Sequence, residues 1–409
     1  ADRIGRLLRQ FPVVAVTGAR QTGKTTLVQH LAGAAGRVYR SLDDPACLEA
    51  ALRDPDTFLA ESPRLTLDEV QRRPELLSAI KRAVDRGRSA GRFLLTGSAN
   101  LLMMARVSES LAGRAVYVNL RPMTEPEKVG RPDAGPWSGL LKAADALAAR
   151  DAIPRAHRAA GAWARAVLEG GFPSAALSSD PADRGAWFDG YVATYVERDL
   201  RQLAQIDALV DFRRLMRISA LRTGRMVNQA DMARDAGLSH ATAHRYLNLL
   251  EASFLISRTP PYAVNRTKRL IKTPTLYWED TGLAAHLAGI GSAEDLRRHE
   301  CGGGLLKNLV WHHLRCWADM AEPRAEVCTW RTASGEEVDF VIESGSRLLP
   351  IEVKSATRVA PDDIRHLGTF LDEYAPRARV GIMLYDGTEC RPLDRRILAV
   401  PLSSALGLP

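Results

Sequence analysis

Eight residues near the N-terminus have the types and spacing needed to hold the phosphates of a nucleotide. Residues 18–25 read Gly-Ala-Arg-Gln-Thr-Gly-Lys-Thr and fit the pattern G-x-x-x-x-G-K-[ST] in every position. In such a loop the glycines let the backbone wrap around phosphate, and the backbone N–H groups supply positive potential. We expect Lys24 to reach the β- and γ-phosphates and the Thr25 hydroxyl to bind Mg²⁺. The apolar run 13–16 and the helical pattern from Thr25 supply the required strand–loop–helix context. The residues expected to bind ATP are Gly18, Ala19, Arg20, Gln21, Thr22, Gly23, Lys24, Thr25 and Thr26.

Two adjacent acids are expected to complete the ATP site. The apolar residues 65–67 run directly into Asp68 and Glu69, a pattern typical of a strand that ends in acids. We expect Asp68 to hold Mg²⁺, directly or through water, and Glu69 to orient and deprotonate the attacking water. The alternative is the first turn of a helix, where the helix dipole favours acids.

Two further positions are candidates for stabilising the transition state. Residues 96–100 end another apolar strand, and Ser98 or Asn100 is expected to contact the γ-phosphate or the water, unless this is an ordinary turn with an N-cap serine. Arg114 is a candidate arginine finger, which in a ring would act on the neighbouring subunit's ATP. The alternative for Arg114 is an arginine at a helix C-terminus, and Arg198 is a rival finger.

The middle of the chain predicts a winged helix. Residues 230–236 indicate a short helix, Ser239 is a candidate N-cap, and residues 240–250 have the pattern of a recognition helix. Strands at 254–256 and 275–278 would flank a basic wing able to meet phosphates. The side chains expected to contact DNA are His240, Thr242, Arg245, Arg266, Lys268, Arg269 and Lys272. The alternative is a winged helix used only for subunit packing.

A second cation site is a possibility near the C-terminus. A two-residue turn at 345–346 would set Asp339 opposite Glu352 and place Lys354 on the same face as Glu352. Opposed carboxylates repel unless a cation lies between them. The arrangement resembles the PD-(D/E)xK nuclease superfamily, in which these acids would bind Mg²⁺. Nucleases of this type usually add a glutamate on the preceding helix, where this chain has Lys307, so an inactive Lys–Glu cluster is the alternative.

The elements that must position these residues form a chain of several domains. Its 409 residues are 46% hydrophobic and 25% charged, which excludes a disordered chain. The fold class is α/β: a parallel-sheet ATPase domain at 1–126, a helical region at 127–209, a winged helix at 210–290 and a mixed α/β nuclease-like domain at 291–409. The net charge of +8 permits a polyanion partner. Five scattered cysteines, no signal-peptide pattern and no apolar run of membrane-spanning length predict a cytoplasmic protein without a membrane partner.

Several segments together resemble the bacterial and archaeal AAA+-like P-loop ATPases that carry a C-terminal domain of unknown function. The matching segments are 18–25, 67–71, 95–98, 110–114, 121–125, 170–173 and 195–200. The resemblance implies ATPase activity and a tail with a winged helix and a nuclease-like domain. We therefore expect an ATP-hydrolysing motor that acts on DNA, with ATP and Mg²⁺ as cofactors and a homo-oligomeric ring, favoured as a hexamer. The alternatives are a nucleotide-controlled, Mg²⁺-dependent DNA nuclease and an ATP-dependent signalling switch that binds a protein partner.

Overall fold

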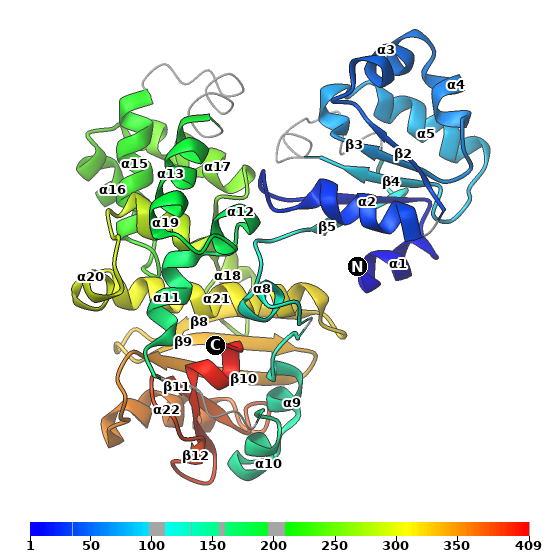
Figure 1. Ribbon diagram of the computed structural model, residues 1–409. Coiled ribbons are helices and arrows are strands. Elements are labelled where there is room, and N and C mark those ends of the chain that lie inside the picture. Colours follow the sequence, from blue (N-terminus) through cyan, green and yellow to red (C-terminus); the bar gives the residue numbers. More distant parts are fainter. Residues whose placement is uncertain (35, 98–110, 132, 155–159, 195–208, 409) are drawn as a thin grey trace. The chain divides into compact units, whose positions relative to one another are not determined.

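The structure is a computed structural model of residues 1–409, and it describes all of them except 35, 98–110, 132, 155–159, 195–208 and 409 (Figure 1). The described chain divides into two compact units. Unit 1 comprises residues 1–121 with 249–255, and unit 2 comprises residues 122–248 with 256–409.

Unit 1 is built on a five-stranded parallel sheet. The strand order is β2-β3-β4-β1-β5, so β4 separates β1, which precedes the phosphate loop, from β3, which ends in Asp68. The strands are β1 (Val13–Thr17), β2 (Val38–Ser41), β3 (Leu65–Asp68), β4 (Phe93–Thr96) and β5 (Ala115–Asn119). The helices are α1 (Asp2–Leu8), α2 (Lys24–Ala34), α3 (Pro45–Arg53), α4 (Pro55–Ala60) and α5 (Leu76–Arg86), with a 3₁₀ turn at Val70–Arg72.

Both faces of this sheet are buried, which explains why its central strands are continuous apolar runs. Successive side chains of a strand point to opposite faces. Val13 and Ala15 therefore pack with Phe58 and Ile80 of the helices on one face, whereas Val14 and Val16 pack with Val28 of α2 on the other. Because all five strands are parallel, their carboxyl ends meet at one edge, and that edge carries the predicted ATP site.

The first part of unit 2 is helical and contains the element order of a winged helix. Its leading helices are α8 (Glu125–Lys128), α9 (Trp137–Lys142), α10 (Ala146–Asp151), α11 (Ala162–Glu169), α12 (Pro173–Ala176) and α13 (Pro181–Tyr191). They are followed by α15 (Leu209–Leu221), α16 (Gln229–Ala236), α17 (His240–Ala252), and the antiparallel strands β6 (Ile256–Thr259) and β7 (Thr275–Trp278). The second wing strand has its predicted bounds, but the first begins at Ile256, whereas 254–256 was predicted. The wing between the two strands contains a short helix, α18 (Arg266–Ile271).

The second part of unit 2 is a six-stranded mixed sheet, which Figure 1 shows beneath the long helix α21. The strand order is β12-β13-β11-β10-β9-β8, with β8, β9 and β10 antiparallel and β10, β11 and β13 parallel. The strands are β8 (Ala325–Arg331), β9 (Glu337–Ser344), β10 (Arg347–Lys354), β11 (Gly381–Tyr385), β12 (Arg391–Pro392) and β13 (Ile397–Pro401). The helices are α19 (Thr281–Leu287), α20 (Ala293–Arg298), α21 (Gly302–Met320), α22 (Arg365–Glu373) and α23 (Leu402–Leu406), with a 3₁₀ turn at Pro361–Ile364. Within the described ranges, no helix combines the length and the apolar character needed to cross a membrane.

Candidate functional site

The phosphate loop lies between β1 and α2 in a conformation that only small residues allow at one point. Gly18 has φ +140°, and a Cβ atom there would lie 2.3 Å from the carbonyl oxygen of Leu120. Gln21 and Gly23 also have positive φ, at 61° and 89°. Alternation of ordinary and left-handed residues turns successive N–H groups toward one point, which is the geometry of an anion-binding nest. The pattern read from the sequence therefore corresponds to a loop shaped for phosphate.

Lys24 is buried at the start of α2 and faces the loop itself. Its Nζ donates hydrogen bonds to the carbonyl oxygens of Gly18 at 3.2 Å and Ala19 at 2.6 Å. Burial lowers the pKa of Lys24 to about 8, although the nearby carboxylates of Glu69 and Asp68 raise it in part. An ammonium group held by two carbonyl oxygens can exchange them for phosphate oxygens, which carry full negative charge.

Asp68 is the centre of a hydroxyl network formed by the carboxyl ends of β3 and β4, Tyr39 of β2 and the start of α2. Its Oδ2 accepts hydrogen bonds from Thr25 Oγ1 at 2.9 Å and from the Tyr39 hydroxyl at 2.8 Å. Its Oδ1 accepts a hydrogen bond from Thr96 Oγ1 at the end of β4. Burial and the bond to Asp68 raise the pKa of Tyr39 to about 12, so the phenol remains a donor. These hard oxygen ligands fit Mg²⁺, and Thr25 and Asp68 are the pair that would hold it.

Glu69 follows directly on β3 with φ 58°, which turns its side chain away from the strand direction. Its backbone N–H donates to Thr96 Oγ1 at 3.1 Å, and the Gln71 amide donates to its carboxylate. Burial raises the pKa of Glu69, and the bond from Gln71 opposes this increase. A carboxylate with a raised pKa is a better proton acceptor from water than an ordinary surface glutamate.

Three members of this network were not singled out from the sequence. Thr96 lies in the strand end where we expected a polar contact, but the expectation named Ser98 or Asn100, which lie outside the described residues. Gln71 follows Glu69 by two positions, and this spacing could have predicted its contact with the Glu69 carboxylate. No local sequence pattern pointed to Tyr39, because only the pairing of β2 with β3 brings it to Asp68.

Arg114 lies at the sheet edge opposite the phosphate loop. It directly precedes β5, whose first residue, Ala115, pairs in parallel with Val13 at the start of β1. Its guanidinium forms two hydrogen bonds with the Asp85 carboxylate of α5, at 2.6 and 2.9 Å. Arg114 therefore lies away from the ATP site of its own subunit and is paired with a carboxylate of its own domain. The rival Arg198 lies outside the described residues.

The side chains proposed for DNA contact fall into two groups. His240 and Arg245 of α17 are exposed and Thr242 is half-buried, while Ser239 caps the helix by accepting the Thr242 N–H at 3.1 Å. Arg266, Lys268 and Lys272 around α18 are also exposed.

Arg269 must be removed from that set. Its side chain is only 4% exposed, and its guanidinium donates to Glu343 at 2.6 Å and to Glu326 at 3.2 Å. It also lies over the ring of Tyr262 at 4.5 Å from the centroid. Arg269 is an internal anchor of the wing, so our expectation that it contacts DNA was wrong.

The hairpin of β9 and β10 has the register predicted from its turn. Leu349 pairs with Ile342 and Ile351 with Phe340, which continues to Glu352 opposite Asp339. The Asp339 N–H donates to Glu352 at 3.3 Å, and the Val353 N–H donates to Asp339 at 3.0 Å.

This acid pair does not fit the metal site that we expected. Lys307 of α21 forms an ion pair with Asp339, and Lys354 lies 3.3 Å from Glu352, so two ammonium groups already balance the carboxylates. Burial, and then the charge of Asp339, raises the pKa of Glu352 to about 8. Among the residues that the structure describes, no cluster of three or more acids, histidines and cysteines could hold a metal ion. We therefore withdraw Asp339 and Glu352 as Mg²⁺ ligands.

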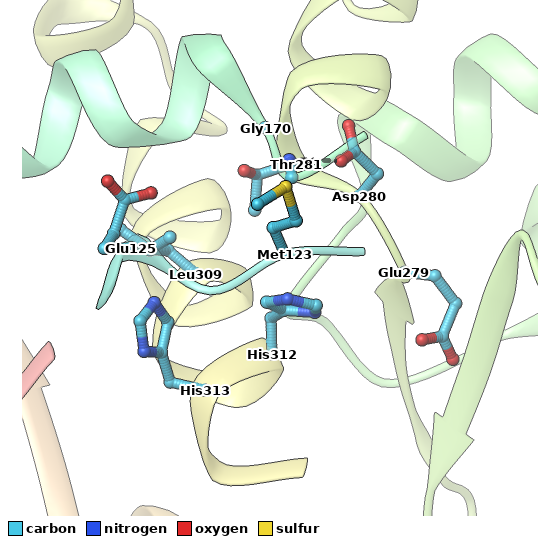
Figure 2. Close-up of a pocket in the computed structure, with 10 residues that line it drawn as sticks. Met123, Glu125, Gly170, Glu279, Asp280, Thr281, Leu309, His312 and His313 are labelled. Carbon is cyan, nitrogen blue, oxygen red and sulfur yellow. Dashed lines mark hydrogen bonds between the residues drawn. The ribbon is translucent and has the colours of Figure 1, made fainter. Parts of the chain in front are cut away.

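A buried polar junction in unit 2 unites two of the segments that carried the family resemblance. The Met123 N–H donates to the Gly171 carbonyl at 2.7 Å, and Asp280 accepts the N–H groups of Gly171 and Leu283 at 2.6 and 2.7 Å. Figure 2 shows His312 and His313 of α21 facing this segment around a cavity of about 10 Å³, room for about one water molecule. Burial holds the pKa of His313 well below its usual value, so this histidine is neutral. These contacts hold in place the segment around Met123, which follows unit 1 in the chain.

Comparison with known proteins finds three matching family segments in the chain. Residues 10–128 match the AAA domain, 161–294 match a domain of unknown function (DUF8612) and 302–405 match another (DUF4143). An uncharacterized protein of Mycobacterium tuberculosis is 32% identical over 407 residues, which are 99% of this chain and 83% of that protein, and one of Mycobacterium bovis matches equally. The solved structure of the Walker-type ATPase PABY2304 of Pyrococcus abyssi is 14% identical with a TM-score of 0.40, covering 70% of this chain and 93% of its own.

Proposed function

Because the chain belongs to the family of AAA-like P-loop ATPases that carry a C-terminal domain of unknown function, we propose that it hydrolyses ATP with Mg²⁺ in order to act on DNA. The observation that carries the hydrolytic part is the hydrogen-bond network of Thr25, Asp68, Thr96 and Glu69, whose two carboxylates also raise the pKa of the adjacent Lys24. A protein that only bound the nucleotide would need the loop, but it would not need a half-buried carboxylate of raised pKa beside it.

The residues divide the chemistry among themselves. The loop N–H groups and Lys24 bind the β- and γ-phosphates, and the Lys24 charge offsets the negative charge of the phosphoryl group as it transfers. Thr25 and Asp68 would hold Mg²⁺, which would supply positive charge to neutralise the phosphates. Glu69 accepts the proton of the attacking water, and Gln71 holds its carboxylate in place. Thr96 links Asp68 to the Glu69 backbone, so the two acids keep their spacing.

The DNA part of the proposal is supported by unit 2. The exposed His240 and Arg245 lie on the helix that a winged helix inserts into the major groove, and Arg266, Lys268 and Lys272 lie on its wing. Exposed cations on such elements neutralise phosphates and release counterions. We propose strand separation, translocation or branched-DNA remodelling as the coupled work.

A ring oligomer completes the proposal. Arg114 lies at the edge opposite the phosphate loop of its own subunit, so as a finger it would act on the ATP of a neighbouring subunit. In a closed ring each subunit would receive one finger and supply one, and we favour a hexamer.

Steady-state ATP hydrolysis with and without single-stranded, duplex and branched DNA tests this function. We expect one DNA form to stimulate hydrolysis, and the Lys24→Ala variant to lose hydrolysis with and without DNA. Stimulation would identify the DNA substrate. If no DNA form changes the rate, the DNA motor is refuted and the ATP-dependent switch with a protein partner becomes the better function.

A further inference from the structure

The most exposed large hydrophobic side chains in the described ranges all lie within eight residues of the wing. Leu270 is 85% exposed, Ile271 79% and Val264 71%. We call residues 264–272 the wing tip. Isolated exposed hydrophobic residues are normal, but three of them gathered on one short segment mark a contact surface.

The wing tip combines these apolar side chains with positive charge. Arg266, Lys268 and Lys272 are exposed between and beside them, and residues 263–274 contain no acid. The partner of such a surface must offer apolar area flanked by negative charge. The face of a base pair flanked by its phosphates has this combination.

The wing tip is also held in place, which a contact element requires. Arg269 fastens it to β8 and β9 through Glu326 and Glu343, and Asn265 caps α18 by accepting the Thr267 N–H at 2.9 Å. Because the anchor is buried, the exposed side chains are presented from a fixed base. Binding therefore orders fewer groups than it would for a flexible loop.

We propose that Leu270 and Ile271 pack against the exposed terminal base pair at a fork or branch in duplex DNA, while the flanking cations hold its phosphates. This inference rests on the proposed action on DNA and names the DNA structure. Inside an intact duplex the same contact requires unstacking of a base step, which offsets much of the gain from burying two aliphatic side chains. At a fork or branch the face of the terminal base pair is already exposed, so no base step has to be unstacked. The free energy gained by burying the two side chains therefore favours binding to a fork or branch over binding to an intact duplex.

Fluorescence anisotropy of the full chain with a forked duplex and a linear duplex of matched sequence tests the inference. For the Leu270→Ser/Ile271→Ser variant we expect roughly tenfold or more weaker binding to the fork and little change on the linear duplex. Both side chains are exposed, so the variant should fold, which thermal melting will check. Leu147→Ser, at another exposed leucine, is the matched control and should bind both DNAs like the wild type.

The possible results separate this inference from the function on which it depends. Unchanged fork selectivity in Leu270→Ser/Ile271→Ser overturns the wing-tip contact, but leaves DNA action intact if the wild type binds DNA. Failure of the wild type to bind any DNA overturns both. Binding to vesicles of anionic lipid, in place of DNA, would identify the wing tip as a membrane-surface element and also overturn the inference. The Arg266→Ala/Lys268→Ala/Lys272→Ala variant should weaken binding to both DNAs and reduce its salt dependence.

Discussion

Burial of Lys24 lowers the pKa of its ammonium group, and this links ATP binding to pH. Its ammonium group loses water in the fold and is held by only two carbonyl oxygens, so its pKa falls to about 8. A bound nucleotide brings phosphate oxygens beside it and must raise that pKa again. ATP binding above about pH 8 therefore requires uptake of a proton by Lys24.

This linkage predicts the pH dependence of ATP affinity. Below pH 8 Lys24 is already charged, so affinity should be flat from about pH 7 to 7.5 and should then fall, approaching about tenfold per pH unit above the pKa. Titration with a fluorescent ATP analogue from about pH 7 to 9.5 measures it. In the Lys24→Arg control the guanidinium stays charged, so its weaker binding should not change with pH. Parallel profiles for the two proteins would show that Lys24 is charged throughout.

At the scale of elements, the sequence predicted what is local and missed what is brought together by the sheet. The hairpin register followed from a turn with glycine first and from side-chain alternation, and it is confirmed. The phosphate loop and the acids after β3 are likewise contiguous segments. Tyr39 and Thr96 meet Asp68 only because β2 and β4 both lie beside β3, and one strand alone carries no sign of its neighbours. Arg37 was hidden by the abundance of arginine, yet it is buried and donates to Thr66, Leu65 and Gly91.

In both the wing and the β9–β10 hairpin, the position of one cationic side chain decides what the element can bind. A basic segment between two strands predicted charges that contact DNA phosphates, but Arg269 is buried because Glu343 and Tyr262 surround it. Likewise, an acid pair across a hairpin predicted a metal ion, but Lys307 supplies the positive charge from α21. In both cases the partner comes from a distant segment. For the wing no local pattern contained that information, whereas for the hairpin Lys307 was already the basis of the alternative, an inactive Lys–Glu cluster.

Removal of Lys307 should therefore destabilise the C-terminal sheet in a pH-dependent way. In Lys307→Met the buried Asp339 loses its ion-pair partner and Glu352 loses a nearby positive charge, and we expect a loss of roughly 3 kcal/mol in the free energy of unfolding at neutral pH. The pKa of Glu352 is already raised to about 8, so folding favours its protonated form, and stability falls as pH increases from 4.5 toward 8. Without Lys307 this fall should be steeper.

Urea unfolding near pH 5 and pH 8 measures the effect. Lys307→Arg retains the positive charge and should stay near the wild type at both pH values. Lys307→Met/Asp339→Asn removes the charge of one acid together with the lysine and should recover much of the loss. Equal stability of Lys307→Met and the wild type at the higher pH would mean that Lys354 alone balances the acids.

At the scale of the whole molecule, our proposal divides the ATP site between two neighbouring subunits. Every group in the network around Asp68 comes from unit 1 of the same chain, but the strongest candidate for transition-state stabilisation, Arg114, lies at the far edge of the sheet. Its ion pair with Asp85 is exposed, and such a pair contributes little to stability. The guanidinium can therefore exchange that carboxylate for a phosphate on a neighbouring subunit at little cost.

Mixing two inactive variants tests this division of the site between subunits. Arg114→Ala should lower kcat by about a thousandfold with little change in KM for ATP, because the finger acts in the transition state. Glu69→Gln should also be inactive, since it removes the proton acceptor. In mixed oligomers an intact Glu69 in one subunit meets an intact Arg114 from its neighbour, so hydrolysis should rise well above the sum of the two variants. Asp85→Ala, which frees Arg114 without removing it, should retain activity, and a mixture no more active than its components would exclude a finger in trans at this position.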